Sequence, residues 1–435
     1  MVAGEPGKPV QVGILGFGNV GSGTFATLQE NAVNIARRAG GPVVVRRVAD
    51  VDWRRPRPLA VDVPEAVRTL DPYVVINDPE IAIVVECIGG VKPARELVLA
   101  ALRAGKNVVT SNKELIAKHG HELLDEADAG GLDIAFEGSV GGGIPVLRSL
   151  KESLAGDSIH TVIGIVNGTT NYILTQMTAR GRDYAEVLAE AQQHGYAEAD
   201  PTSDIEGYDA AYKLAILASI AFSSRVRLEE IYREGIGRVT AADIGYAGQL
   251  GYVIKLLAIA RDTPDGLELR VHPAFLPATH PLAAVSDVFN AIFVEGSSVG
   301  EVMFYGRGAG ARPTGSAMAG DIVEVARNIR HGCTGRVPCT CFYDKPVRPM
   351  EDIETKHYFR TRVADRPGVL ARMAAVFGEE QVSIASLLQT SAAADEAEIV
   401  WITHRTREGG MRRALDRIAR LPEVMEVCSW IRVEA

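Results

Sequence analysis

Residues 10–21 of the chain read VQVGILGFGNVG. The first six predict a buried strand, and the glycines that follow have the Gly-x-Gly-x-x-Gly spacing of a turn that binds a dinucleotide and opens a helix. The first glycine permits the tight bend, the second lets backbone approach a pyrophosphate, and the third lets helix and strand pack closely. We therefore expect the cofactor to contact the turn itself, namely Gly16, Phe17, Gly18, Asn19, Val20 and Gly21.

The sequence after this turn predicts a parallel sheet. A helical stretch runs to about residue 39, and strands then alternate with helices, of which residues 92–104 are the clearest. Such alternation is typical of α/β proteins with helices on both faces of the sheet, which predicts a Rossmann-type domain over residues 1–146. The other strands are predicted at residues 43–49, 81–87, 107–110 and 132–136, and residues 303–330, with a helix at 318–330, are expected to complete the domain.

The adenosine end of the cofactor is less well defined by the sequence. An acidic residue that binds the ribose should follow the second strand, and Asp50 is the nearest candidate. Beyond it lie Arg54, Arg55 and Arg57, which can hold a 2′-phosphate and so favour NADP, or can form a solvated basic loop. The sequence leaves the choice between NAD and NADP open.

Two lysines are candidates for catalysis. Lys113 follows the fourth strand, at the edge of a parallel sheet where ligands bind, although a lone lysine there is usually an ordinary surface residue. Asp209 and Lys213 lie four residues apart on a predicted helix, one turn from each other, which is usually a surface salt bridge. Lys213, however, borders the most apolar stretch of the chain, and such a setting lowers the pKa of a lysine.

Carboxylates crowd the residues just before Lys213. They are Glu198, Asp200, Asp204, Glu206 and Asp209. Excess negative charge can hold a substrate ammonium group, and a neighbouring carboxylate can anchor the lysine. The sequence therefore predicts a site that binds a zwitterion and exchanges a proton with it.

The C-terminal residues predict a separate small module. Residues 331–355 contain three cysteines and three prolines and suggest a linker. Residues 356–435 then predict the order β-α-β-β-α-β, which is a ferredoxin-like pattern. Cys333, Cys339 and Cys341 are close enough for metal or redox chemistry, but they lack a second ligand pair at zinc-site spacing, so a structural or incidental role is the alternative.

Composition excludes several classes of protein. With 435 residues, two to three domains of roughly 100–200 residues are expected. The formal charge of −9 argues against a general nucleic-acid binder, and no apolar run approaches the roughly 20 residues of a membrane helix. Five unevenly spaced cysteines and no signal-peptide pattern indicate a cytoplasmic protein.

The segment AEADPTSDIEGYDAAYK (residues 197–213) belongs to a pattern, beginning at Ala191 and ending at Lys213, that resembles the signature of homoserine dehydrogenases. The similarity extends to VVECIGG, VVTSNK, GIVNGTTN, FNAIFVEG and MFYGRGAG. The closing stretch, from VADRPGVLARMAAVF, is similar to an ACT domain. The resemblance covers residues 10–433 and implies the interconversion of L-homoserine and L-aspartate 4-semialdehyde, on the route to threonine, methionine and isoleucine.

The resemblance also implies roles for individual residues. Glu198, Asp204 and Asp209 would bind the substrate, Lys213 would transfer the proton, and Lys113 would orient the reacting oxygen or carboxylate near the nicotinamide. Residues 147–302 would form an α+β domain for substrate binding and dimerisation. Gly195, Gly308 and Gly310 would complete the cofactor cleft.

Two further ligands follow from the resemblance. A monovalent cation, usually sodium, would be held by Glu137 and the carbonyls of Val140, Gly142 and Ile144, unless this loop is only a glycine-rich connector. The ACT domain would bind threonine as a feedback inhibitor and would pair with a second copy in a homodimer or homotetramer, or would serve assembly alone. The effector contacts would be Asp365, Gly368, Val369 and Leu370.

Two other functions are compatible with parts of the sequence. A semialdehyde dehydrogenase would need a nucleophilic cysteine, for which Cys87 is the candidate, but no base lies near it in the sequence. A non-catalytic ligand sensor built from the cofactor and ACT folds would not need the Asp209 and Lys213 pair.

Overall fold

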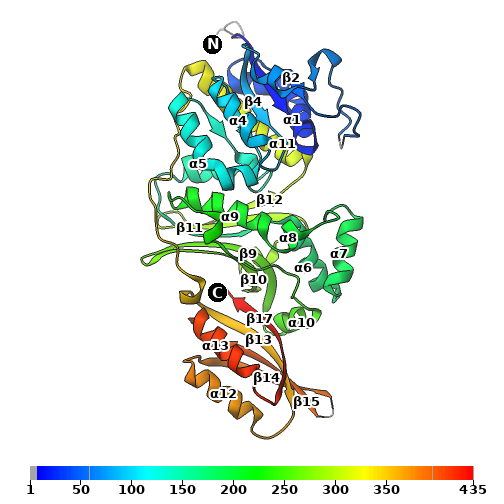
Figure 1. The fold of residues 1–435 in the computed structure, drawn as a ribbon, viewed down its shortest axis with the longest axis vertical. Coiled ribbons are helices and arrows are strands. Elements are labelled where there is room, and N and C mark those ends of the chain that lie inside the picture. The colour runs from blue at the N-terminus through cyan, green and yellow to red at the C-terminus, as the bar shows by residue number, and fades with distance from the viewer. Residues whose placement is uncertain (1–6, 58, 394, 435) are drawn as a thin grey trace. The chain divides into compact units, whose positions relative to one another are not determined.

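The computed structural model describes residues 7–57, 59–393 and 395–434, and it contains two compact units (Figure 1). The first comprises the described residues up to His160, together with Tyr212–Leu228 and Asn290–Asp344. The second comprises Thr161–Ala211, Glu229–Phe289 and the described residues from Lys345 onward. These units do not coincide with the domains expected from the sequence, whose boundaries stay a prediction.

The first unit contains the predicted parallel sheet. Its strand order is β3-β2-β1-β4-β5-β6, the order of a Rossmann fold. The strands are β1 Val10–Leu15, β2 Val43–Ala49, β3 Arg68–Thr69, β4 Ile81–Glu86, β5 Asn107–Thr110 and β6 Ile134–Ala135. The α/β class predicted from the alternation of strands and helices is therefore confirmed.

Helices cover this sheet, and two of them differ from the sequence prediction. The helix expected to run to residue 39 is interrupted at Asn31, and the helix expected from residue 318 begins seven residues earlier, at Ala311. The helices of this unit are α1 Asn19–Glu30, α2 Ala32–Ala39, α3 Pro72–Ile76, α4 Ala94–Arg103, α5 Lys113–Gly130 and α11 Ala311–His331. The unit also contains β12 Gly300–Arg307 and nearly all of β11 Phe289–Gly296, whose first residue is assigned to the second unit.

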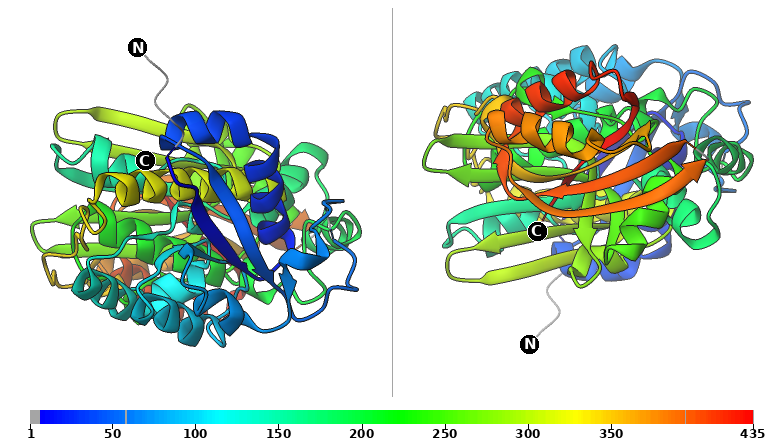
Figure 2. Two further views of the ribbon diagram at one scale, coloured as in Figure 1. Left: turned by 90° about the horizontal axis from the view of Figure 1, so that it is seen from above. Right: turned by 90° about the horizontal axis from the view of Figure 1, so that it is seen from below.

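Helix α11 returns the chain to the cofactor domain by packing on α1 (Figures 1 and 2). The contact is closest at two glycines: a Cβ on Gly23 would lie 1.9 Å from the carbonyl oxygen of Ala311, and one on Gly315 would lie 2.5 Å from the Gly23 carbonyl carbon. Larger residues at these two positions would push the helices apart. This close approach supports the expectation that residues 303–330 complete the domain.

The second unit is built on a long mixed sheet. Its strands lie in the order β7-β9-β10-β17-β13-β15-β14. They are β7 Ile159–Ile165, β9 Tyr252–Thr263, β10 Gly266–Pro277, β13 Glu354–Ala364, β14 Ile384–Ala393, β15 Glu396–Thr403 and β17 Val424–Val433, with β8 Tyr232–Arg233 and β16 Thr406–Arg407 beside β10 and β13. The helices are α6 Gly168–Arg180, α7 Tyr184–Gln193, α8 Thr202–Ile205, α10 Ala241–Gln249, α12 Val369–Glu379 and α13 Glu408–Ile418, and α9 Tyr208–Ala221 starts here and continues in the first unit.

The C-terminal residues have the predicted ferredoxin-like fold. The order β17-β13-β15-β14 and two helices on one face match the β-α-β-β-α-β pattern (Figure 2). Phe359 and Trp401 stack with ring centroids 5.4 Å apart in the core between sheet and helices, and Phe377 from α12 contacts both rings. The predicted ACT-like module is therefore present.

This module is not separated from the rest of the second unit. Strand β17 pairs on its other edge with β10, through Ala274 with Arg432 and Phe275 with Val433. Sequence reasoning missed this because pairing between distant strands leaves no local pattern. The consequence is one continuous sheet rather than two domains joined only by a linker.

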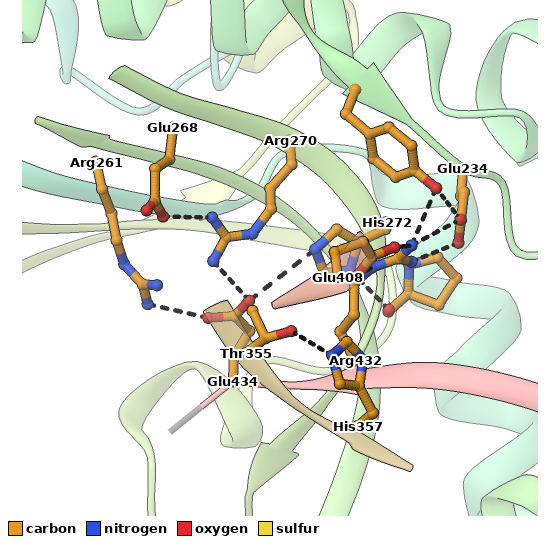
Figure 3. A network of polar contacts seen from close by, with 12 residues as sticks. Glu234, Arg261, Glu268, Arg270, His272, Thr355, His357, Glu408, Arg432 and Glu434 are labelled. Atoms are coloured by element: carbon orange, nitrogen blue, oxygen red, sulfur yellow. Dashed lines mark hydrogen bonds and ion pairs between the residues drawn. The ribbon is translucent and has the colours of Figure 1, made fainter. Parts of the chain in front are cut away.

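Buried charges anchor the last residues of the chain to β10 (Figure 3). Glu434 accepts from Arg270 at 2.8 Å and from Arg261 at 3.0 Å, and Arg270 is fully buried. Burial alone would raise the pKa of Glu434, but the two guanidinium groups hold it well below its usual range. Nearby, Arg432 pairs with Glu234 at 2.7 Å and with Glu408. Because every one of these groups lies in the second unit, the network stabilises the joint between β10 and the C-terminal module.

In the described part of the chain, no helix has the length and apolar character needed to cross a membrane.

Candidate functional site

The glycine-rich turn lies where β1 ends and α1 begins. Gly16 has φ of +89°, and a Cβ on Gly21 would lie 2.1 Å from the Gly16 carbonyl oxygen, so both positions need glycine for the turn itself. A Cβ on Gly18, by contrast, would meet nothing within 4 Å, and no described side chain caps the first turn of α1. Open space beside uncapped N–H groups is what a pyrophosphate requires, so this turn fits a dinucleotide.

Asp50 braces this turn. Its Oδ2 accepts the backbone N–H of Phe17 at 2.7 Å and the Arg57 guanidinium at 3.2 Å. Arg57 also donates to the Phe17 carbonyl at 2.8 Å and packs over the rings of Phe17 and Trp53. The structure thus brings Asp50 to the turn, as expected of a cofactor residue.

Arg54 and Arg55 are placed differently from Arg57. Both are exposed on the loop after β2, and the structure brings neither to the turn. Arg57, which is part-buried, is the arginine that reaches it. Arg57 belongs to the basic loop that the sequence indicated.

Lys113 is held at the end of β5 by a buried network. It is the first residue of α5, which Asn112 caps by accepting the N–H of Leu115 at 3.1 Å. Asn112 also donates to the Gly90 carbonyl at 2.7 Å, and the fully buried Glu86 accepts the Thr110 hydroxyl at 2.6 Å. This network fixes where α5 starts, and therefore where Lys113 lies, at the carboxyl edge of the sheet. Sequence reasoning found Lys113 but not its supports.

Helix α5 packs against α9 within the first unit. The Lys118 ammonium lies 5.3 Å from the centre of the Tyr212 ring, and residues of both helices line one pocket. Lys213, next to Tyr212 on α9, is buried with 7% of its surface exposed. Lys113 and Lys213 are thus carried by neighbouring helices. Asp209, one turn before Lys213 on α9, is 3% exposed, so the pair is not the surface salt bridge that spacing alone would suggest.

Asn167 holds two of the predicted carboxylates together. Its Nδ2 donates to Asp204 Oδ1 at 2.7 Å and to Asp209 Oδ2 at 2.9 Å. The same side chain caps α6 through its Oδ1, which accepts the N–H of Thr170 at 2.9 Å. Thr169 adds a hydroxyl 2.9 Å from Asp204 Oδ2. Asn167 and Thr169 were missed as site residues, although both lie in the NGTTN segment that carried the resemblance.

Glu198 and Gly195 lie on the loop between α7 and α8. Glu198 is exposed, and its backbone carbonyl accepts the Gln192 amide at 3.1 Å. Gly195 has φ of +71°, which closes the turn after α7, and a Cβ there would meet nothing within 4 Å. The structure therefore brings Asp204 and Asp209 together and leaves Glu198 at the surface of the second unit.

The two other glycine-rich loops pack against each other. Gly142 has φ of +55°, and a Cβ there would lie 2.5 Å from the carbonyl oxygen of Gly308. The N–H of Gly143 donates to the Arg307 carbonyl at 3.1 Å. Gly310, with φ of +122°, precedes α11 without a side-chain cap. These glycines are required by backbone packing, in addition to any ligand that the loops bind.

The predicted cation ligands fit a cation only in part. The carboxylate of Glu137 is engaged by the backbone N–H groups of Leu147 at 2.9 Å and Arg148 at 2.7 Å. The carbonyls of Val140 and Gly142 accept no backbone hydrogen bond from the described residues. Carbonyl oxygens suit a hard cation, so the backbone of this loop fits one better than the Glu137 side chain does. No group of three His, Cys, Asp or Glu side chains in the described ranges is arranged to hold a metal.

The predicted effector turn is exposed. Gly368, with φ of +92°, precedes α12 and leaves its N-terminus without a side-chain cap. Val369 is buried in the core of the module, whereas Asp365 is exposed and Leu370 is 37% exposed. An uncapped helix start of this kind can take a carboxylate.

Comparisons with known proteins agree with this arrangement. Sequence models described as the NAD binding domain of homoserine dehydrogenase, as homoserine dehydrogenase and as the ACT domain match residues 16–137, 145–323 and 357–423. The homoserine dehydrogenase of Corynebacterium glutamicum is 46% identical over 435 residues, which covers 99% of this chain and 96% of that protein.

Solved structures give the same result. A homoserine dehydrogenase from Thiobacillus denitrificans is 44% identical with a TM-score of 0.93, and the match covers 98% of each chain. A hyperthermophilic archaeal homoserine dehydrogenase in complex with NADPH is 29% identical with a TM-score of 0.62, over 73% of this chain and 98% of that one. The chain therefore belongs to the homoserine dehydrogenase family and is an NAD(P)-dependent oxidoreductase that acts on a CH–OH group.

Proposed function

We propose that the buried carboxylate of Asp209 and the partly buried carboxylate of Asp204, held together by Asn167, bind the ammonium group of L-homoserine. The observation that carries this proposal is the single amide that donates to both carboxylates, at 2.7 and 2.9 Å. Two ionised carboxylates close together repel each other unless a cation or donors stabilise them. A substrate ammonium group would add a positive charge beside these two carboxylates. Glu198, exposed on the adjoining loop, would contribute from the surface when substrate binds.

Lys213 is the proposed proton-transfer group. It is buried one turn after Asp209, so its ammonium group has lost much of its hydration while a carboxylate stays near it along the helix. A lysine so placed can exchange a proton with a substrate hydroxyl held beside it. Lys213 would take the hydroxyl proton of homoserine, and would return it to the aldehyde oxygen in the reverse reaction. Lys113, at the start of α5, would orient the reacting oxygen or the carboxylate.

The cofactor is proposed to be NADP or NAD, bound at the turn from Gly16 to Gly21. The nicotinamide accepts or supplies the hydride, and the protein supplies position and charge. The pyrophosphate would lie on the N–H groups of α1 beside Gly18, where a Cβ would meet nothing. NADPH is bound by the archaeal relative, and the basic loop with Arg54, Arg55 and Arg57 favours the same choice here.

The competing activity of a semialdehyde dehydrogenase is not supported by Cys87. Burial, followed by the charge of Glu86, raises the pKa of this thiol well above its usual value. A nucleophilic cysteine needs the opposite shift. The proposed function is therefore hydride exchange at the alcohol carbon without a covalent intermediate.

We also propose a cation, an effector and an oligomer. The cation would be monovalent and held by carbonyls of the loop containing Val140, Gly142 and Ile144. Threonine would bind at the turn from Asp365 to Leu370 and inhibit. A second copy would add to β14, the edge strand of the second unit, where Leu387 and Leu388 are each 38% exposed.

Removing the C-terminal module is a poor test of the effector site. Truncation before β13 would strip β17 from β10 and would leave the buried Arg270 without Glu434. A point variant avoids this damage: Asp365→Ala should relieve inhibition by threonine and keep the uninhibited rate, whereas Asp416→Ala on α13 should change neither. Equal inhibition of Asp365→Ala and the native chain would place the effector elsewhere.

The catalytic proposal is tested by following absorbance of the reduced cofactor. The purified chain should reduce NADP or NAD when L-homoserine is added, and should not do so with an alcohol that lacks the amino group. No reduction with either cofactor would contradict the proposal, and equal rates with the deaminated alcohol would contradict the role of the carboxylates.

A further inference from the structure

A pocket in the first unit contains chemistry that the reaction does not use. It is formed by α5, α9 and the segment around residue 340, and its lining includes Ile116, His121, Lys151, Ile216, Cys339 and Cys341. The same two helices carry Lys113 and Lys213. The pocket that contains the two thiols is therefore formed in part by the helices that carry both candidate catalytic lysines.

The two cysteines lie two residues apart in the chain, and both line this pocket together with His121. Cys341 Sγ also lies 3.9 Å from the carbonyl oxygen of Ser219, on α9. The backbone N–H of Cys339 donates to the Asp128 carboxylate, on α5, at 3.3 Å. The segment thus contacts α5 through the backbone of Cys339 and α9 through the thiol of Cys341, and both thiols are only partly buried.

The protonation of the pair is uneven. The side chain of Cys341, followed by that of His121, lowers the pKa of Cys339. The side chain of Cys339, followed by burial, raises the pKa of Cys341. Cys339 is therefore the more acidic thiol of the pair. This is the arrangement of an attacking cysteine beside a resolving cysteine.

We propose that Cys339 and Cys341 form a reversible disulfide on exposure to a peroxide, and that this modification slows the dehydrogenase through α5 and α9. The Cys339 sulfur attacks one peroxide oxygen and the O–O bond breaks, which leaves a sulfenic acid and, after protonation, water. The Cys341 sulfur then attacks the Cys339 sulfur, the S–O bond breaks, and a second water leaves. Two thiols are oxidised by two electrons in total, and one hydrogen peroxide is reduced to two waters.

The spacing of the cysteines makes this disulfide easy to reduce. Residues two apart can be at most about 7 Å apart along an extended chain, and a disulfide needs Cα atoms roughly 4.4–6.8 Å apart. A disulfide between residues two apart closes a small ring, and strained disulfides are the labile, regulatory ones. Forming the bond would draw the Cys341 sulfur away from the Ser219 carbonyl and would disturb the packing of α9, the helix that carries Lys213.

The test uses the full-length chain with cofactor present. Hydrogen peroxide should remove most of the homoserine-dependent turnover, and dithiothreitol should restore it. Non-reducing peptide mass spectrometry should find the peptide with Cys339 and Cys341 lighter by two hydrogens. Cys339→Ser should keep its turnover under peroxide and should form no disulfide. Cys333→Ser, which changes a neighbouring cysteine, should behave as the native chain does.

Three results would overturn the proposal. One is the absence of the lighter peptide after peroxide treatment. Another is the disulfide without a loss of turnover, which would exclude an effect through the helices. The last is an equal, irreversible loss of turnover in the native chain and in Cys339→Ser.

A second measurement examines the thiolate without using activity. An ordinary cysteine has a pKa of about 8.5, so it is almost fully protonated at pH 5 and reacts slowly with iodoacetamide. Cys339 should be alkylated at pH 5 well before Cys333 in the same chain. His121→Ala should slow this labelling. Equal labelling of Cys339 and Cys333 would contradict the proposed thiolate.

Discussion

The side-chain amide of Asn167 donates to the buried carboxylate of Asp209 at 2.9 Å. The other hydrogen of the same amide is used by Asp204, at 2.7 Å. A neutral residue before α6, outside the stretch from Ala191 to Lys213, therefore holds the two carboxylates together.

Replacing Asn167 should weaken substrate binding without unfolding α6. Asn167→Ser keeps a residue that caps helices well. It removes the side-chain amide that donates to both Asp204 and Asp209. A hydrogen bond to a charged group contributes about 1.5–3 kcal/mol, so kcat/KM for homoserine should fall roughly 10–150-fold. The thermal midpoint should change little, and cofactor binding, measured by fluorescence, should be retained. An unchanged kcat/KM would show that the amide does not position the carboxylates.

The arginines after β2 should differ in their effects on the cofactor. Arg57→Ala should raise KM for both NADP and NAD, because Arg57 contacts the Phe17 carbonyl and Asp50 at the turn. Arg54→Ala and Arg55→Ala should raise KM for NADP alone if they hold the 2′-phosphate, by roughly tenfold or more for a charge-assisted contact. Initial rates with both cofactors decide this. Unchanged KM for NADP in both exposed variants would remove Arg54 and Arg55 from the cofactor site.

Glu434 should matter more for stability than another carboxylate on the preceding strand. Glu434→Gln leaves the fully buried Arg270 without its full counter-charge, and breaking one partner of a buried pair costs about 3–5 kcal/mol. Glu426→Gln removes a surface pair with Arg362, both partners about half exposed, and should cost at most about 1 kcal/mol. Denaturant unfolding compares the two variants. Equal losses would show that the network in Figure 3 does not stabilise the joint with β10.

Asp321 should give the first unit a characteristic pH dependence. Burial raises the pKa of this carboxyl to about 7 in spite of its ion pair with Arg148, against a usual value of 3.8. The folded state then binds the proton more tightly than the unfolded state, so stability should fall as pH rises from about 4 to about 7. In Asp321→Asn, thermal melts should no longer show this fall in stability with rising pH. Parallel pH profiles for the two proteins would mean that Asp321 does not carry the raised pKa.

Local patterns in the sequence were sufficient to predict much of the fold. The span of β2 matches the prediction residue for residue, because its apolar run is bounded by Gly-Pro before and by Asp50 after. The helix through Asn31 was predicted as continuous because an interruption of one residue does not change the amphipathic pattern. The pairing of β17 with β10 could not be predicted, since it joins residues more than 150 apart and depends on tertiary packing.

The site was predicted in its charged residues and missed in its neutral ones. Asp209 and Lys213 were found because charge beside an apolar helix is conspicuous in a sequence. Asn167 and Asn112 were missed because an asparagine before a helix has a sufficient explanation as a cap, and only coordinates show the second bonds that each makes. Glu198 was expected beside Asp209 by resemblance, and its role stays a prediction because its side chain is exposed.

The measurement that tests the central claim most directly is turnover in Lys213→Ala with saturating homoserine. Loss of a proton-transfer group should lower kcat by roughly 10²–10⁴-fold, while cofactor binding stays within a factor of about two. The native chain should also lose activity at low pH in the direction of homoserine oxidation, because a protonated lysine cannot accept the hydroxyl proton, and this dependence should vanish from the residual rate of the variant. A variant with native kcat and an unchanged pH profile would contradict the account.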